Sequence, residues 1–207
     1  MSAAHRPSDE TLAAFAAGSL DEGLALVVAA HVELDPESRR RVREFQAVQG
    51  LLLDAAEPVA MAGRPSVGGG RAVPVAFGAG APPVEAGMPR VLSPYALGAW
   101  RPIGIRIAMR RLSVPGAQSR VFMLRAGPGI ALPHHRHTGF EWTTILSGAY
   151  EHEYGRYAAG DFDEADAEHD HTPRVDPVEG CTCIVAMTGN VLFQGWLGRL
   201  LQPLVRL

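Results

Sequence analysis

Large apolar side chains in the first quarter of the chain recur at the three- and four-residue spacing of amphipathic helices. Between Ser8 and about Asp54 they are Leu12, Phe15, Leu24, Val27, Val28, Val42, Phe45, Val48, Leu51 and Leu52. Asp35 followed by Pro36 is typical of a helix N-cap with proline in the first turn, and Gly18 separates the first two periodic segments. The pattern predicts three short helices before residue 55.

The pattern changes to short apolar segments that alternate with turn residues from about Pro94 onward. The segments are Ile103–Ile107, Ser119–Leu124, Trp142–Leu146, Ala149–Tyr154, Thr182–Met187 and Val191–Trp196. Strands of this length and spacing are typical of an all-β sandwich or barrel.

The stretch between these two patterns is rich in Gly, Pro and Ala and includes Gly68–Gly70, which indicates a linker. We therefore predict a small all-α domain at 1–57, a linker at 58–93 and a β domain at 94–207. The apolar tail, Leu197–Leu207, is expected to pack as a final helix or strand.

Composition excludes several classes of function. The net charge is −3 and the 19 basic residues, all Arg, are scattered, so we expect no direct nucleic-acid binding. The N-terminus lacks the features of a secretory signal, and the most apolar stretch, Leu24–Ala30, is too short to cross a bilayer, which predicts a cytoplasmic protein without membrane contact. Cys181 and Cys183 are expected on one face of a strand as reduced thiols.

A cluster of histidines in the β domain has the spacing of metal ligands. His135 and His137 stand two apart, so they project to one side of a strand, and Glu141 follows a short turn and can face them. The interval from Gly129 through these three residues to Gly148 resembles the first cupin motif.

A second block begins at Gly160, and His171 stands eleven residues later, at the offset of the last ligand in the second cupin motif. This resemblance implies a cupin (double-stranded β-helix, or jelly-roll) barrel with four metal ligands, which are His135, His137, Glu141 and His171. His169 would share the face of His171 and is the alternative fourth ligand, whereas His134 should point away and His152 has no motif behind it. Asp166 and Glu168 replace the usual proline and second glycine of this block, so the turn must be built differently.

Three imidazoles and one carboxylate suit Zn²⁺, Fe²⁺, Mn²⁺ or Ni²⁺, so the ligand types do not select the metal.

The whole chain resembles the ChrR-type zinc-binding anti-sigma factors. The resemblance rests on the order of a short helical domain, a linker and a cupin, on Cys181-Thr182-Cys183, and on the segment Gly198–Leu204. It implies that the helical domain binds an extracytoplasmic-function sigma factor. It also implies that the cupin domain binds Zn²⁺, with Fe²⁺ or Mn²⁺ as alternatives, and releases the sigma factor under oxidative stress.

The same resemblance implies a structural zinc in the helical domain, at positions that are here His5, His31, Asp35 and Ser38. The family has cysteines at the last two positions, and losing two thiolates removes the soft, high-affinity donors. We expect Asp35 to cap a helix and His31 to pack on an apolar face, and zinc held by His5, His31 and Asp35 is the alternative. The family's additional helix before the linker has no counterpart in Met61–Pro89, which is poor in helix formers.

A different class of function, a cupin metalloenzyme such as a dioxygenase or isomerase, is also open at this point. An octahedral metal with four protein ligands would keep two positions for substrate or dioxygen, and Phe140, Trp142 and Tyr150 would line the pocket. Tightly held zinc would favour the sensor, whereas iron with substrate turnover would favour the enzyme.

Overall fold

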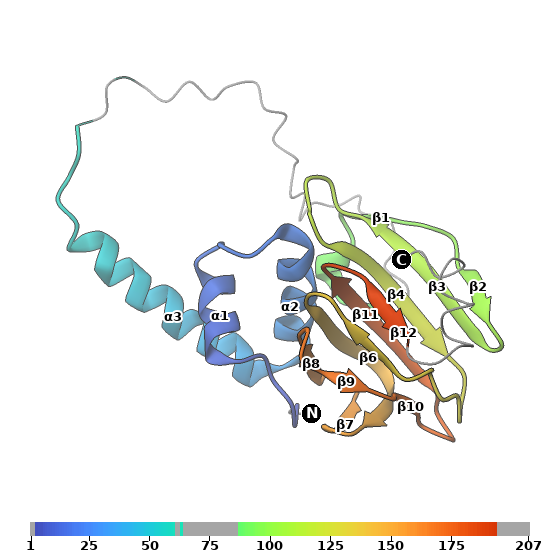
Figure 1. Ribbon diagram of the computed structural model, residues 1–207. Helices are drawn as coiled ribbons and strands as arrows, with labels where there is room; N and C mark the ends of the chain where they lie inside the picture. Colours follow the sequence, from blue (N-terminus) through green and yellow to red (C-terminus); the bar gives the residue numbers. More distant parts are fainter. Residues whose placement is uncertain (1–2, 61–62, 64–86, 194–207) are drawn as a thin grey trace.

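The computed structural model describes residues 3–60, 63 and 87–193. It confirms three N-terminal helices, which are α1 (Asp9–Ala16), α2 (Glu22–Leu34) and α3 (Pro36–Asp54) (Figure 1). The N-cap side chains of Ser8, Asp21 and Asp35 each accept a hydrogen bond from a backbone N–H in the first turn of their helix. In the described part of the chain, no helix is both long and apolar enough to cross a membrane.

The rest of the described chain is an antiparallel β structure of two sheets, which confirms the predicted mainly β, cupin-like fold. A 3-10 turn, η1 (Arg90–Leu92), precedes it. The strands are β1 (Ala96–Leu97), β2 (Arg101–Gly104), β3 (Ile107–Ser113), β4 (Arg120–Ala126), β5 (His135–His137), β6 (Glu141–His152), β7 (Gly155–Ala158), β8 (Phe162–Ala165), β9 (Asp170–His171), β10 (Arg174–Val175), β11 (Cys181–Met187) and β12 (Val191–Phe193). The large sheet has the order β1-β3-β4-β11-β6-β10, with β2 paired to β3 and with β7 and β8 paired to β6. The small sheet has the order β12-β5-β9.

The large sheet is buried on both faces at its central strand β11. On β11, Ile184 and Ala186 belong to the core shared with the helices, whereas Cys183 and Val185 belong to the core inside the barrel. This explains why β11 is almost continuously apolar instead of alternating. The helix that covers the outer face is α2, which contacts β4, β6 and β11.

The helices and the barrel therefore share one core. Leu24, Val27 and Val28 of α2 are buried in the same cluster as Met123 and Trp142 of the barrel strands. Because each fully buried aliphatic side chain contributes about 1.5–3 kcal/mol, this contact stabilises both parts.

The segment Ala3–Ser8, here called the N-terminal strap, runs along β8. The backbone N–H of Phe162 donates to the carbonyl oxygen of His5 at 3.1 Å, and the Asp161 carboxylate accepts from the N–H groups of Ala4 and His5 at 2.6 and 3.1 Å. The Glu164 carboxylate accepts from the N–H of Ser8 at 2.8 Å. The beginning of the chain is thereby fixed to the outside of the barrel beside β7 and β8 (Figure 1).

Some strand boundaries differ from those predicted. The predicted segments Trp142–Leu146 and Ala149–Tyr154 merge into the single strand β6, which ends at His152, because its pairing with β11 shifts by one residue near Leu146 instead of ending there. Such a bulge keeps the strand continuous while Gly148 adopts a positive φ of 69°. The predicted tail, and the linker residues 61–62 and 64–86, lie outside the described residues, and the predicted domain boundaries stay predictions.

Candidate metal centre

Four side chains converge at one end of the barrel. His135 and His137 come from β5, His171 from β9, and Glu141 from the first position of β6. Antiparallel pairing sets His135 opposite His171, so both rings lie on the same side of the small sheet. One potential ligand atom from each of the four residues lies within 4.8 Å of the others.

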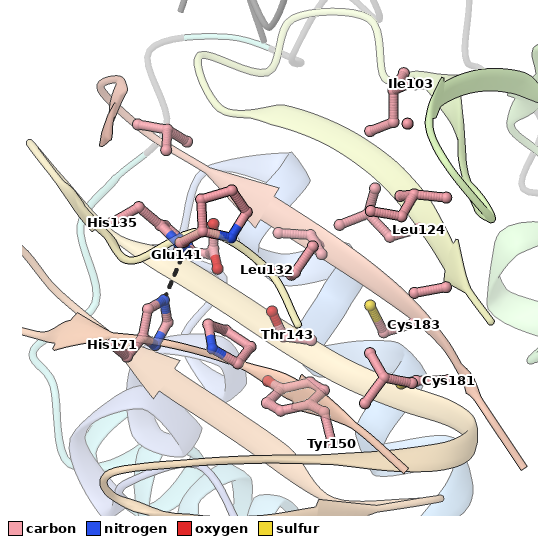
Figure 2. A pocket seen from close by; sticks show the side chains of 18 of the residues that line it. Ile103, Leu124, Leu132, His135, Glu141, Thr143, Tyr150, His171, Cys181 and Cys183 are labelled. Atoms are coloured by element: carbon pink, nitrogen blue, oxygen red, sulfur yellow. Dashed lines mark hydrogen bonds between the residues drawn. The ribbon is translucent and has the colours of Figure 1, made fainter. Parts of the chain in front are cut away.

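The three imidazoles point their Nε2 atoms at one another. His171 Nε2 lies 3.1 Å from His135 Nε2 and 3.2 Å from His137 Nε2, and Glu141 Oε2 lies 3.4 Å from His137 Nδ1. Figure 2 shows His135, Glu141 and His171 grouped at one end of a cavity, with the His135–His171 contact dashed.

Burial controls the protonation of this cluster. It lowers the pKa of His137 to about 4 and the pKa of His171 to about 3, with the neighbouring charge of His135 as the second cause. The imidazoles are therefore neutral at pH 7 and offer lone pairs. Burial also raises the pKa of Glu141 to about 8, with Asp163 adding to the effect, because the carboxylate has lost water. Neutral imidazoles beside a carboxyl group that lacks a counter-charge form a donor set that fits a divalent metal ion.

The other histidines of the barrel lie outside this group. His169 Nδ1 is 2.8 Å from the carboxylate of Asp166, and its ring packs against Tyr154. His134 Nε2 is 2.7 Å from the carboxylate of Asp170 on the partly exposed side of the strand. The structure thus brings His171, and not His169, to the other three side chains.

A second polar group adjoins the cluster and was missed in the sequence. The buried carboxylate of Asp163 accepts from Tyr150 Oη at 2.7 Å and lies 2.9 Å from His152 Nε2, and the His152 and His171 rings are 4.9 Å apart. Burial alone would raise the pKa of Asp163, but the hydrogen bonds of His152 and Tyr150 outweigh it and lower that pKa. His152, Asp163 and His171 form a second group that could hold a metal ion. The one sign of this group was Asp163 itself, an acidic residue within the largely buried strand β8.

A cavity of about 250 Å³ extends from the cluster into the barrel. Its walls are mainly apolar, and Cys181 and Cys183 both line it, as expected for alternate residues of one strand (Figure 2). The hydrogen bond with Cys181 and burial raise the pKa of the Cys183 thiol well above its ordinary value. A thiol with so little thiolate is a poor nucleophile, so Cys183 serves as part of the apolar wall.

The aromatic residues suggested for a pocket are only partly there. Tyr150 lines the cavity. Trp142 instead points to the opposite face of the sheet, where it packs in the core shared with α2, and Phe140 is nearly half exposed. The correction follows from strand alternation, because residues 141 and 143 face the cavity and residue 142 must face away.

The fold and the site together define a cupin protein with an N-terminal helical unit packed on its barrel. Residues 91–190 match the family model described as a ChrR cupin-like domain. The chain is 34% identical to the anti-sigma-E factor ChrR of Cereibacter sphaeroides over 218 aligned residues, which cover 100% of both proteins. It is also similar to a chain in the crystal structure of Rhodobacter sphaeroides SigE in complex with the anti-sigma ChrR, with a TM-score of 0.69, 32% identity, and coverage of 89% of this chain and 98% of that chain. The chain belongs to the ChrR family of anti-sigma factors.

Proposed function

We propose that this chain is a cytoplasmic anti-sigma factor that sequesters an extracytoplasmic-function sigma factor through its helical unit and senses oxidative stress through a metal ion in its cupin barrel. The observation that carries the proposal is the 34% identity to ChrR, which extends over the helical unit as well as the barrel. The similar solved chain, in the complex of SigE with ChrR, supports a sigma factor as the partner class.

The end of α3 supplies a surface for such a partner. Val48, Leu51, Leu52 and Leu53, here called the α3 apolar end, are 54–78% exposed. The buried residues of α3 all lie in its first half, and the helix projects away from the barrel (Figure 1). Neighbouring large apolar side chains left in water are typical of an interaction site.

The double substitution Leu51→Ser/Leu52→Ser tests this surface. Burial of each leucine against a partner contributes about 1.5–3 kcal/mol, so we expect the dissociation constant for the cognate sigma factor to rise roughly 100-fold or more. Val178→Ser is the control, because Val178 is an apolar residue on the barrel that is at least as exposed (81%) as the two leucines. Unchanged affinity in the leucine variant, measured by calorimetry, would remove the α3 apolar end from the interface. Recovery of no sigma factor with the chain from the native host would remove the proposed function.

We propose His135, His137, Glu141 and His171 as ligands of a tightly held Zn²⁺. When bound, the metal would supply the positive charge that the partly buried Glu141 carboxylate lacks. Strand β8 connects these ligands to the helical unit. Ala165 of β8 pairs with Glu141, and His171 follows β8 in the chain. The outer side of β8 holds the N-terminal strap. Oxidation or loss of a ligand would loosen β8 and with it the hold on the helical unit.

Metal analysis of the purified full chain tests the ligand set. His171→Ala should lose the bound metal, whereas His134→Ala and His169→Ala should retain one equivalent, because their rings lie outside the cluster. Retention of metal in His171→Ala together with its loss in His169→Ala would reverse the assignment.

The cavity beside the cluster favours one second candidate, a metalloenzyme acting on a small apolar molecule as a dioxygenase or isomerase. About 250 Å³ of mainly apolar space touching His135, Glu141 and His171 would admit such a substrate. Iron in the protein as isolated, with turnover that His171→Ala abolishes, would support the enzyme. Stoichiometric zinc without turnover would support the sensor.

A further inference from the structure

A fully buried polar group lies at the corner between α2 and α3. The side chains of His31, Asp35 and Ser38 have no exposed surface there. The Asp35 carboxylate accepts hydrogen bonds from Ala3 N at 3.2 Å, Arg6 Nε at 2.8 Å and Ser38 N at 2.9 Å. Ser38 Oγ also lies 2.9 Å from it, so each oxygen of the carboxylate has a polar partner.

The ring of His31 is engaged at both nitrogens. Nδ1 lies 2.9 Å from the carbonyl oxygen of Gly160 in the barrel, and since a carbonyl only accepts, Nδ1 carries the proton. Burial lowers the pKa of His31 to about 4, with the charge of Asp35 opposing the shift, so the ring is neutral and its Nε2 is an acceptor. The Ser38 hydroxyl lies 2.8 Å from Nε2 and 2.9 Å from the Asp35 carboxylate, and its single proton can be donated to only one of these two acceptors at a time.

His5, the remaining position of the family's zinc site, is turned away from this group. The ring of His5 packs against Tyr157 of β7, with the ring centroids 4.4 Å apart. Among the described residues, the potential metal-binding groups all lie in the barrel and none includes His31 or Asp35. The residues present therefore do not fit a zinc ion, and the nearest cation to the carboxylate is the guanidinium of Arg6.

We infer that the helical unit binds no zinc and is held instead by a metal-free polar latch of Arg6, His31, Asp35 and Ser38, in which the guanidinium supplies the positive charge. The latch joins the N-terminal strap through Arg6, α2 through His31, α3 through Ser38 and the barrel through Gly160.

The N-terminal strap bonds to both sides. Ala3 and Arg6 donate to Asp35 at the helix corner, whereas the N–H groups of Ala4 and His5 donate to Asp161 of the barrel. The strap is thus clamped between the helical unit and the barrel, and Arg6 provides its charge–charge contact with the helices.

The latch restricts where an oxidative signal enters the molecule. Arginine is always protonated and needs no loading step, so chelation does not open the latch. Both cysteines of the chain, Cys181 and Cys183, lie in the barrel, which leaves the helical unit without a thiol to oxidise. Together with the proposed barrel site, on which this point rests, the latch implies that the chain carries one metal ion and that oxidation acts on the barrel alone.

Metal content of the purified full chain, loaded with zinc under reducing conditions, tests the inference. We expect one equivalent in the native chain and none in His135→Ala/His171→Ala. An equivalent that persists in the double variant and disappears when His31→Ala is added would overturn the latch. A native chain without metal would instead overturn the barrel site and support a metal-free helical unit, so the two proposals fail in different ways.

Two further variants separate the side chains from their surroundings. Asp35→Cys/Ser38→Cys restores thiolates beside His31 and should gain one equivalent of zinc. Absence of that gain would contradict the idea that these two side chains are what excludes the metal. Arg6→Met should raise the hydrogen-exchange rate of the Ser38 amide at least tenfold, and Arg6→Lys should give a rate between those of the native chain and Arg6→Met. In His135→Ala/His171→Ala, a chelator should leave the exchange rate of this amide unchanged. A rise on chelation in that variant would also overturn the latch.

Discussion

Substitution of Asp35 by alanine should destabilise the protein more than any surface ion-pair change. It removes the N-cap of α3, worth about 1 kcal/mol, and leaves the buried N–H of Ala3 without its acceptor. Removing one partner of a buried charge pair costs about 3–5 kcal/mol. Because the Arg6 side chain is 33% exposed, its charge can regain water, which sets the expectation at the lower end, about 3 kcal/mol.

Equilibrium urea unfolding followed by circular dichroism at 222 nm measures this loss, and the urea midpoint should fall while the slope stays constant. In a double-mutant cycle with Arg6→Met, the Arg6–Asp35 coupling should be about 1.5–3 kcal/mol, the range expected for a hydrogen bond to a charged group. Asp9→Ala is the matched control, because Asp9 pairs with Arg41 on the surface of the same helices, where water screens the charges.

Two results would refute the reasoning. A loss below about 1 kcal/mol for Asp35→Ala would mean that the carboxylate contributes no more than an ordinary helix cap. A coupling energy near zero would mean that Arg6 and Asp35 act independently, and the guanidinium could not then be the charge that holds the latch together.

Three further predictions follow from contacts across the molecule. Asp35→Asn should make the free energy of unfolding fall less steeply as the pH drops below 4. Burial alone would raise the pKa of Asp35, but hydrogen bonds from Ser38, Arg6 and Ala3 outweigh it and hold that pKa well below its ordinary value of about 3.9, so the stabilisation is present above about pH 4 and is lost as the pH falls further. An unchanged slope below pH 4 would contradict this. Glu164→Ala should cost about 1–3 kcal/mol in urea unfolding, because it leaves the N–H of Ser8 without its acceptor, and a loss under about 0.5 kcal/mol would show that water replaces the carboxylate. Thr144→Val, close to isosteric, should cost about 1 kcal/mol by removing the buried hydroxyl that donates to the carbonyl of Val27 at 2.8 Å, and thermal unfolding at an unchanged midpoint would count against that contact.

Local sequence patterns predicted the features that depend on local geometry. The helices follow from apolar periodicity, and three members of the metal cluster follow from two alternate residues on a strand and a carboxylate after a turn. Which apolar residues of α3 form core was not predictable in this way, because Val42 and Leu52 fit the same periodicity and differ only in what packs against them.

The missed residues depend on pairings between distant segments. Asp163 of β8 pairs with Thr143 of β6, yet its carboxylate contacts Tyr150 and His152 farther along β6, and only the folded barrel brings these side chains together. Arg6 carries no motif, and its partner Asp35 is 29 residues away. Local sequence patterns do not indicate which distant residues become neighbours, so the polar latch became visible only in the folded structure.

The clamped N-terminal strap also has a consequence for the order of events during synthesis. The bond from Ala4 to Asp161 spans 157 residues, and the bond from Thr11 to Glu164 spans 153 residues. At roughly 5–20 residues per second, the ribosome needs roughly 8–30 s between making the two partners of each bond. During that interval the nascent helices have neither β8 beneath the strap nor the large sheet beneath α2. The helices are therefore available to a partner protein before the barrel is complete, and closing the strap is a late step of folding.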